Sequence, residues 1–207
     1  MSLSWTPIHG LILAGGQSSR MGEDKALLDI AGKPLLRHII DRMESLGIFA
    51  ITVAVADSER EARYREALGS FGEPELIRYA HDQFAGCGPL AGLHAGLSSI
   101  QAECYVFVLA CDMPSLSESL YARMVAASYE SDSEVIRTPE QPFHALYHTR
   151  AVPKLLRQLE QGELRMMRML DQLLTKLIEP AALEEEAFRN LNTREAYEQF
   201  GRGHEMR

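Results

Sequence analysis

Short runs of apolar residues alternate with longer stretches of helical periodicity through the first half of this chain. The clearest run, from Tyr105 to Ala110, is apolar throughout, which is typical of a strand buried on both faces of a sheet. Strands that alternate with helices of this length form βαβ units around a mainly parallel sheet. The expected strands are 8–14, 51–55, 75–79 and 105–110, and the expected helices are 35–46, 58–68 and 90–100.

The pattern becomes looser after about residue 131. A candidate strand covers 143–148, a helical stretch from 152 to 174 is interrupted at Gly162, and a last helix covers 194–200. The chain has no internal repeat, low-complexity block or linker long enough to separate domains. We therefore expect one α/β domain over 1–207, a Rossmann-like three-layer αβα sandwich with a mainly parallel central sheet.

Charge and composition narrow the class of function. The net charge of −8 argues against a general binder of nucleic acid or of membrane surfaces, although a local pocket can still bind a small anion. No apolar window approaches the ~18 residues that a membrane helix needs, and the N-terminus lacks the basic patch and apolar core of a secretion signal. Three scattered cysteines form neither a disulfide framework nor a C-x-x-C metal motif. We expect a cytoplasmic protein without a nucleic-acid or membrane partner.

A glycine-containing loop follows the first expected strand, in the stretch L-I-L-A-G-G-Q-S-S-R-M-G-E-D-K from Leu11 to Lys25. It is not a P-loop, because Gly22 is followed by glutamate where that motif has lysine. It is not the dinucleotide motif G-x-G-x-x-G either, because Gly15 and Gly16 are adjacent. The loop must therefore be interpreted from its own residues.

These residues suit the binding of phosphate. Open α/β sheets bind ligands beyond the carboxyl ends of their strands, where this loop is expected to lie. Glycines let backbone N–H groups approach anionic oxygens closely, Arg20 offers a planar fork for a phosphate, and Lys25 offers a point charge. An ordinary βα loop with two surface cations is the alternative, and the length of the loop favours a functional one.

The loop also resembles that of a known family. The stretch from Leu13 to Lys25 matches L-A-G-G-x-S-x-R-M-G-x-D-K, the signature of the molybdenum cofactor guanylyltransferases called MobA. The related cytidylyltransferases usually begin with Ala-Ala-Gly and lack the aspartate before the lysine, so the stretch Ala14-Gly15-Gly16 and Asp24 favour the guanine branch. The resemblance implies a fold like that of the nucleotide-diphospho-sugar transferases. It also implies a nucleotide-binding half at about 8–115 and an acceptor-binding part at about 116–200.

Further segments resemble the nucleotide side of the same family. Residues 88–93, G-P-L-A-G-L, are similar to a segment that lines the base and ribose, and Asp82 matches an aspartate near the nucleotide. Asp112 in C-D-M-P matches the family's C-D-x-P, and the resemblance implies that it holds Mg²⁺ over the triphosphate. The alternatives are a glycine-proline helix start and an Asp-x-Pro turn. One departure is Asp57, where relatives often carry asparagine.

Other segments resemble the acceptor side. Residues 142–147 are similar to H-P-x-F-G-L-Y, but Gln141 and His144 depart from that pattern. Arg165 matches a G-x-x-R segment, and the resemblance places it near the pterin phosphate. Asn190 and Asn192 match F-x-N-x-N-T, which the resemblance places near the metal and the second substrate. Arg165 as a helix-surface residue and Asn192 as a helix cap are the alternatives.

The resemblance implies transfer of GMP from GTP to the phosphate of molybdopterin, with Mg²⁺ as cofactor and pyrophosphate as the second product. Other proteins of molybdenum cofactor biosynthesis are implied as further partners. A sister transferase that uses CTP or a sugar 1-phosphate is the nearer alternative, and a non-catalytic GTP-binding regulator is the more distant one. The implied catalytic residues are Lys25, Arg20 and Asp112; the implied nucleotide-binding residues are Leu13, Ala14, Gly15, Gly16, Lys25, Asp82, Gly88, Pro89, Leu90 and Asp112.

Overall fold

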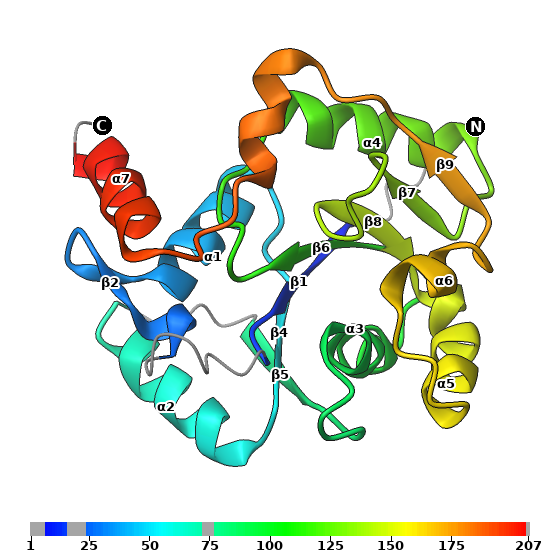
Figure 1. Ribbon diagram of the computed structural model, residues 1–207, viewed down its shortest axis with the longest axis horizontal. Coiled ribbons are helices and arrows are strands. Elements are labelled where there is room, and N and C mark those ends of the chain that lie inside the picture. Colours follow the sequence, from blue (N-terminus) through cyan, green and yellow to red (C-terminus); the bar gives the residue numbers. More distant parts are fainter. Residues whose placement is uncertain (1–6, 16–23, 72–76, 206–207) are drawn as a thin grey trace.

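The computed structural model describes residues 7–15, 24–71 and 77–205, and its centre is one seven-stranded sheet (Figure 1). The strand order is β5-β4-β1-β6-β8-β7-β9. Helices cover both faces of this sheet, so the three-layer αβα fold predicted from the sequence is confirmed. The strands are β1 (His9–Leu13), β4 (Ile51–Val55), β5 (Ile77–His81), β6 (Tyr105–Ala110), β7 (Val135–Arg137), β8 (Ala145–His148) and β9 (Thr175–Leu177).

The four strands of the first half are parallel and hold the order β5-β4-β1-β6. The chain therefore builds outward from β1 on one side and then crosses to the other side to form β6. That change of direction is a topological switch point at the carboxyl ends of β1 and β6, the place where open α/β sheets commonly bind their ligands. The second half pairs differently, because β8 runs antiparallel to both β6 and β7.

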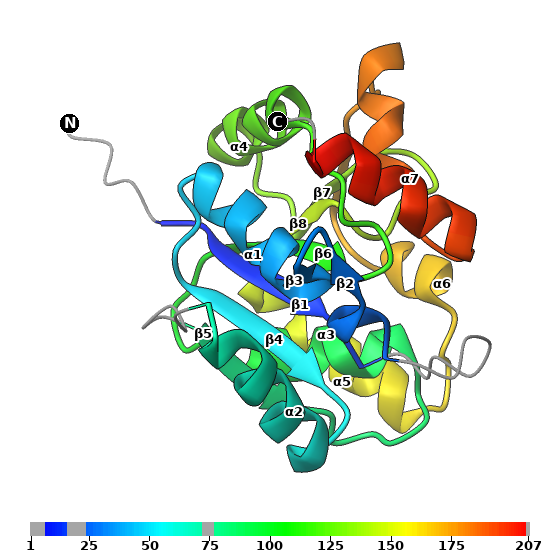
Figure 2. The ribbon, with the colours of Figure 1, turned by 90° about the vertical axis from the view of Figure 1, so that its left-hand side faces the viewer.

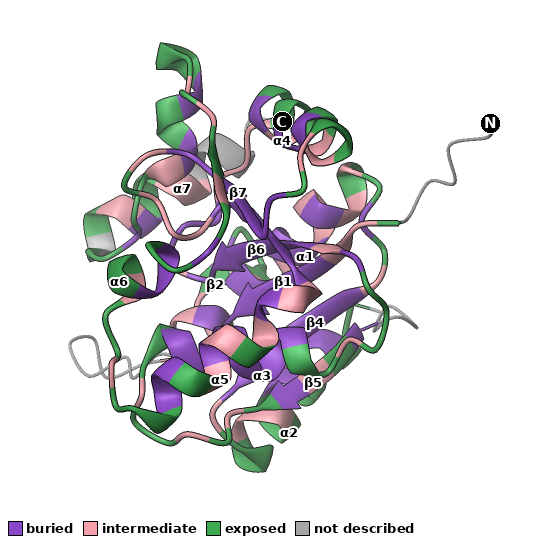
Figure 3. Cartoon of the chain, turned by 90° about the vertical axis from the view of Figure 1, so that its right-hand side faces the viewer, coloured by how far each residue is buried: buried purple, intermediate pink, exposed green. Residues whose placement is uncertain are grey.

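Two apolar cores hold the layers together. One lies between the sheet and α1, α2 and α4, and the other lies between the sheet and α3, α5 and α6. Figure 3 shows the strands as buried, while the outer sides of the helices are exposed. The helices are α1 (Leu35–Ser45), α2 (Ser58–Gly69), α3 (Pro89–Ser98), α4 (Glu118–Glu130), α5 (Val152–Glu160), α6 (Met166–Leu170) and α7 (Arg194–Glu205), with 3-10 turns η1 (Lys25–Leu27), η2 (Thr149–Ala151) and η3 (Ala182–Phe188).

Close contact between α3 and the sheet depends on one glycine. A Cβ atom on Gly96 would lie 2.2 Å from a methyl carbon of Leu11 on β1, so no larger residue fits without a shift. Burial of Leu11 and Leu97 beside it fixes how far α3 stands from the strands. Helix α3, whose first turn carries the segment expected to bind the base, therefore packs closely against the central strand.

The sequence located most elements, with some corrections. The helix over 35–46 and the strands at 51–55 and 105–110 are confirmed, but the strand expected at 75–79 is Ile77–His81. The helical stretch expected over 152–174 consists of α5 and α6, and Gly162 separates them with a φ of +69°. The pattern did not reveal α4, β7, β9 or the small hairpin of β2 (Asp29–Ile30) and β3 (Lys33–Pro34). None of the described helices combines the length and apolar character needed to cross a bilayer.

Candidate active site

The segments that follow the parallel strands leave the sheet at one edge, in register with each other. The Cys111 N–H after β6 donates to the carbonyl of Leu13 in β1 at 3.1 Å. On the other side of β1, the Ala14 N–H donates to the Ala54 carbonyl at 3.0 Å, and the Asp82 N–H donates to the Val55 carbonyl at 2.9 Å. Gly15, Asp82 and Asp112 therefore begin their loops side by side at the carboxyl edge of the sheet.

Asp24, near the end of the glycine loop, is turned inward. Its side chain is 7% exposed and accepts hydrogen bonds from the Tyr64 hydroxyl at 2.9 and 3.1 Å and from the Ala26 N–H at 3.2 Å. The Arg60 guanidinium lies 3.4 Å from the same carboxylate. Because the Tyr64 hydroxyl also lies 3.2 Å from the carbonyl of Ala14, α2 ties both ends of the loop to β1.

Lys25 projects to the outside of this anchored turn and meets the C-terminal part of the chain. Its ammonium donates to the Oδ1 of Asn192 at 2.7 Å, across a sequence separation of 167 residues. One residue earlier, the Leu191 N–H donates to the backbone carbonyl of Asp112 at 2.7 Å. The segment around Asn192 therefore joins the end of the glycine loop to the end of β6.

Electrostatic effects confirm that these groups share one small region. Burial raises the pKa of the Cys111 thiol, which keeps that thiol neutral. The carboxylates of Asp112 and Asp24 raise the same pKa further, and the Lys25 ammonium opposes them. Burial and the Asp24 carboxylate likewise raise the pKa of the Tyr64 hydroxyl, so it remains a hydrogen-bond donor. Two carboxylates and one ammonium thus act on the one buried thiol of Cys111 at the switch point.

The start of α3 borders the same edge. Gly88 has a φ of +66° and a ψ of −152°, a conformation that favours glycine, and Pro89 occupies the first turn. The Asp82 carboxylate accepts a hydrogen bond from the Phe84 N–H at 2.7 Å, which shapes the loop before the helix. The side chain of Leu90 is buried in the core, so only its backbone can face a ligand.

The structure does not bring all of the predicted residues into this cluster. Gly16 and Arg20 lie outside the described residues. Arg165 is exposed at the start of α6, and its backbone N–H donates to the Glu163 carboxylate. Asn190 is exposed two residues before Asn192, in the segment that crosses the carboxyl edge.

Comparison with known proteins agrees with this arrangement. A family model described as a MobA-like NTP transferase domain matches residues 10–177. The chain belongs to this family. It is accordingly a nucleotidyltransferase, as the resemblance of the glycine loop implies.

Relatives in this family match almost the full chain. A molybdenum cofactor guanylyltransferase from Serratia proteamaculans is 37% identical over 195 residues, which cover 91% of each chain. The protein of the same name from Vibrio atlanticus is 33% identical over 201 residues, covering 95% of this chain and 96% of the relative. The crystal structure of molybdopterin-guanine dinucleotide biosynthesis protein A from Archaeoglobus fulgidus has the same fold. Its TM-score is 0.75 at 22% identity, with 97% of this chain and 100% of that chain covered.

The residues of this MobA-like site fit a metal that arrives with a nucleotide. Nucleotidyltransferases of this type generally use a divalent metal ion. No group of three or more His, Cys, Asp or Glu side chains lies close enough to hold a metal within the described parts of the chain. Asp112, which is half-buried, offers one hard carboxylate ligand, and substrate phosphates commonly supply the others for an ion such as Mg²⁺.

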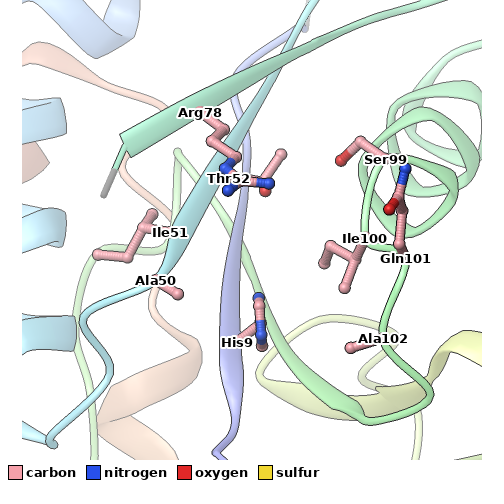
Figure 4. Close-up of a pocket in the computed structure, with 9 residues that line it drawn as sticks. All are labelled: His9, Ala50, Ile51, Thr52, Arg78, Ser99, Ile100, Gln101 and Ala102. Atoms are coloured by element: carbon pink, nitrogen blue, oxygen red, sulfur yellow. The ribbon is translucent and has the colours of Figure 1, made fainter. Parts of the chain in front are cut away.

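A cavity of about 200 Å³ lies at the opposite, amino edge of the sheet (Figure 4). His9, Thr52 and Arg78 line it from three neighbouring strands, together with residues 99–102 beyond the end of α3. None of the nine described lining residues is acidic, and none belongs to the residues that the sequence predicted for the site. This cavity is therefore separate from the residues predicted to bind the nucleotide.

Sequence reasoning missed two residues that support the site. Arg60 and Tyr64 lie four positions apart on α2, which places both side chains on one helix face toward Asp24. Their spacing of four residues is present in the sequence, but nothing in the sequence shows that Asp24 is their common partner. Asp57, the departure from the usual asparagine, caps α2 by accepting a hydrogen bond from the Arg60 N–H at 2.8 Å.

Proposed function

We propose that this nucleotidyltransferase transfers GMP from GTP to the phosphate of molybdopterin, giving molybdopterin guanine dinucleotide and pyrophosphate. Guanylyltransferase activity in molybdenum cofactor biosynthesis, the function named for its relatives, implies GTP and molybdopterin as the substrates. The single observation that carries the site assignment is the Lys25–Asn192 hydrogen bond beside the end of β6. Together with the bond from the Leu191 N–H to the Asp112 carbonyl, it joins the loop, the end of β6 and the C-terminal segment at one edge of the sheet.

The nucleotide binds along the carboxyl edge in this proposal. The backbone from Leu13 to Gly16 approaches the phosphates, and Arg20 and Lys25 neutralise their charge. Asp82 and the start of α3 contact the ribose and base. The anchoring of Asp24 by Tyr64 supports this role, because it fixes the backbone on which Lys25 stands. The Gly88 conformation leaves the backbone at the start of α3 open to a ligand.

Catalysis then depends on position and charge. The pterin phosphate attacks the α-phosphorus of GTP in line, the bond from that phosphorus to the β-phosphate bridging oxygen breaks, and pyrophosphate leaves. No covalent enzyme intermediate is needed, so the chain orients the two phosphates and stabilises negative charge. The Lys25 ammonium, which donates to Asn192 in this structure, donates to phosphate oxygens in place of Asn192 or in addition to it. Asp112 holds Mg²⁺, which supplies charge neutralisation when it is bound.

The acceptor approaches from the C-terminal part of the chain. Asn192 and Asn190 lie on the segment that crosses the carboxyl edge, so they are suited to contact molybdopterin beside the metal. Arg165 contributes a guanidinium for the pterin phosphate from the start of α6. In this view residues 1–207 form one domain, with nucleotide binding at about 8–115 and acceptor binding at about 116–200.

The cellular setting follows from the chemistry. All three cysteines are free thiols, and Cys104 and Cys111 are buried, which agrees with a reducing cytoplasm. Molybdopterin is delivered and its dinucleotide product received by other proteins of molybdenum cofactor biosynthesis. These partners bind near the C-terminal segment if that segment receives the acceptor.

Pyrophosphate release tests the proposed function. The purified chain is incubated with Mg²⁺ and with GTP or CTP, each with and without molybdopterin. We expect release with GTP only when molybdopterin is present. Release with CTP in place of GTP would identify a cytidylyltransferase, release with a sugar 1-phosphate would identify the sugar branch, and GTP binding without any release would identify a regulator.

A further inference from the structure

Tyr197 on α7 has a buried hydroxyl that the proposed reaction leaves unused. The residue is 7% exposed, and its hydroxyl has no hydrogen-bond partner among the described residues. Leaving a buried hydroxyl unpaired costs free energy of folding, and native proteins contain few such groups. A phenylalanine would fill the same space without this cost. The hydroxyl therefore calls for a functional reason.

The backbone on both sides of Asn192 fixes this tyrosine near the end of β6. Leu191 is held on the Asp112 carbonyl at 2.7 Å, and the Tyr197 N–H donates to the carbonyl of Thr193 at 3.2 Å. Tyr197, Leu191 and Cys111 belong to the same apolar core. Figure 2 shows α7 alongside the β2–β3 hairpin, and a Cβ on Gly201 would lie 3.6 Å from Ile30 in β2. Contacts at both ends therefore hold α7 in place.

The groups that face the hydroxyl identify its partner. A tyrosine hydroxyl is an O–H donor, and Tyr197 packs in the same apolar core as Cys111 and as Leu191, whose N–H is bound to the Asp112 carbonyl. Burial raises the pKa of this hydroxyl most, and Cys111 and Asp112 both act on it electrostatically. Since a thiol is only a weak acceptor, the Asp112 carboxylate is the strong acceptor nearby.

We propose that Tyr197 is a positioning residue that donates a hydrogen bond to the Asp112 carboxylate when nucleotide and metal are bound. The inference rests on the metal-holding role given to Asp112 in the proposed function. Carboxylates that ligate metals are usually held by such second hydrogen bonds, and losing one typically lowers metal affinity or activity by ~10–100-fold. Helix α7 would then orient Asp112, the proposed metal ligand at the end of β6, although the two lie far apart in the sequence.

Replacing Tyr197 by phenylalanine separates this role from a purely structural one. We expect Y197F to keep or raise the melting temperature, because the unpaired hydroxyl disappears. The affinity for Mn²⁺–GTP, measured by titration calorimetry, should fall by on the order of tenfold. Y105F is the matched control, because the Tyr105 hydroxyl donates to the Ser133 carbonyl at 2.5 Å from the amino end of β6. It should lower the melting temperature and leave the Mn²⁺–GTP affinity unchanged.

A double-mutant cycle with Asp112→Asn tests whether Tyr197 acts through Asp112. In the D112N background, Y197F should cause no further loss of Mn²⁺–GTP affinity. An equal loss in both backgrounds, or a wild-type affinity of Y197F, would overturn the inference. If the wild type binds Mn²⁺–CTP and not Mn²⁺–GTP, the proposed function is wrong, and the same cycle measured with CTP still decides the role of Tyr197. Binding of neither nucleotide would overturn both proposals.

Discussion

The two edges of the central sheet carry similar side chains and differ in what those side chains meet. At the carboxyl edge the cations meet acceptor side chains: Lys25 donates to the amide oxygen of Asn192, and Arg60 lies beside the Asp24 carboxylate. At the amino edge, His9, Thr52 and Arg78 surround a cavity whose described lining contains no acidic residue. The cavity lies away from the residues proposed for the site, and those residues lie where polar side chains from distant segments meet. The proposed site is therefore argued from convergent side chains and not from empty volume.

The difference has a topological cause. Parallel strands send their carboxyl ends to one edge, and the change of chain direction between β1 and β6 leaves their loops free to surround a ligand. At the amino edge α3 ends at Ser98, beside the cavity that Arg78 also lines. The carbonyls at the end of a helix favour a nearby cation, which gives a structural reason for an arginine at this edge. Substitutions at the carboxyl edge should therefore lower activity more than substitutions at the amino edge.

The largest expected effect is from Asp112→Ala. We expect it to lower kcat by on the order of 10³-fold, because it removes the proposed metal ligand. The melting temperature should hardly change, since Leu191 is bound to the backbone carbonyl of Asp112 and not to its carboxylate. Arg78→Ala at the amino edge is the control and should leave pyrophosphate release within about twofold of wild type. Equal losses in both variants would break the comparison of the two edges.

Lys25→Ala should have the next largest effect. Loss of a group that stabilises developing charge typically lowers kcat by on the order of 10²-fold. Steady-state assays of pyrophosphate release measure the change. Lys33→Ala removes the same charge from an exposed ion pair with Asp41 and should retain wild-type kcat. A Lys25→Ala enzyme with normal turnover would remove this residue from the mechanism.

Acid should destabilise the carboxyl edge through His144. This residue is 2% exposed, its Nε2 lies 2.7 Å from the Ser115 carbonyl, and burial lowers its pKa from the ordinary 6.5 to about 4. A histidine whose folded pKa is depressed gives full stability above 6.5 and loses it as the pH falls toward 4. From about pH 7 to about pH 5 the loss is about 2 kcal/mol, measurable by urea unfolding at each pH.

Two histidine variants test how much of this acid sensitivity comes from the carboxyl edge. His144→Gln should flatten most of the loss of stability between about pH 7 and pH 5, even if it lowers stability at every pH. His9→Gln at the amino edge should remove a smaller part of the loss, because burial and Arg78 also lower the pKa of His9 but the residue is only partly buried. The same steep loss in His144→Gln would show that another group titrates.

Tyr64→Phe should have a smaller effect. It removes hydrogen bonds to Asp24 and Ala14, and the Asp24 carboxylate keeps Arg60 and the Ala26 N–H as partners. We expect a loss of about 1–2 kcal/mol in the free energy of unfolding. The KM for GTP should rise while kcat changes less, because Lys25 remains present on a looser turn. Unchanged stability and KM would show that α2 does not support the loop.

Much of the fold was predictable because it depends on local patterns. Apolar runs such as Tyr105–Ala110 specify buried strands whatever their neighbours, and helical periodicity gave α1 almost to the residue. Helix α4 was missed although its N-cap, Ser117, accepts a hydrogen bond from the Leu120 N–H. The shorter strands of the second half were missed because three residues, as in β7 and β9, carry little periodicity.

The proposed site residues also differ in how far the sequence predicts them. Asp112 and Gly88 could be proposed from the sequence because each lies within a short motif next to a predictable element, and their roles stay predictions. In the sequence, His144 differs from other residues only as a departure from a motif. In the structure it has a φ of +56°, a conformation that glycine adopts freely. The sequence alone could not predict roles for Tyr64 and Tyr197, since neither lies in a local motif and both depend on partners from other segments.

The sequence by itself determined the alternation of strands and helices, the glycine loop and the aspartate at the end of β6, because these depend on residues close together in the chain. The tertiary structure decided which of them meet. It turned Asp24 inward to Tyr64, brought Asn192 to Lys25 across 167 positions, and placed a buried hydroxyl near Asp112. The reason is physical: contacts between distant segments follow from strand order and helix packing, which no local pattern encodes.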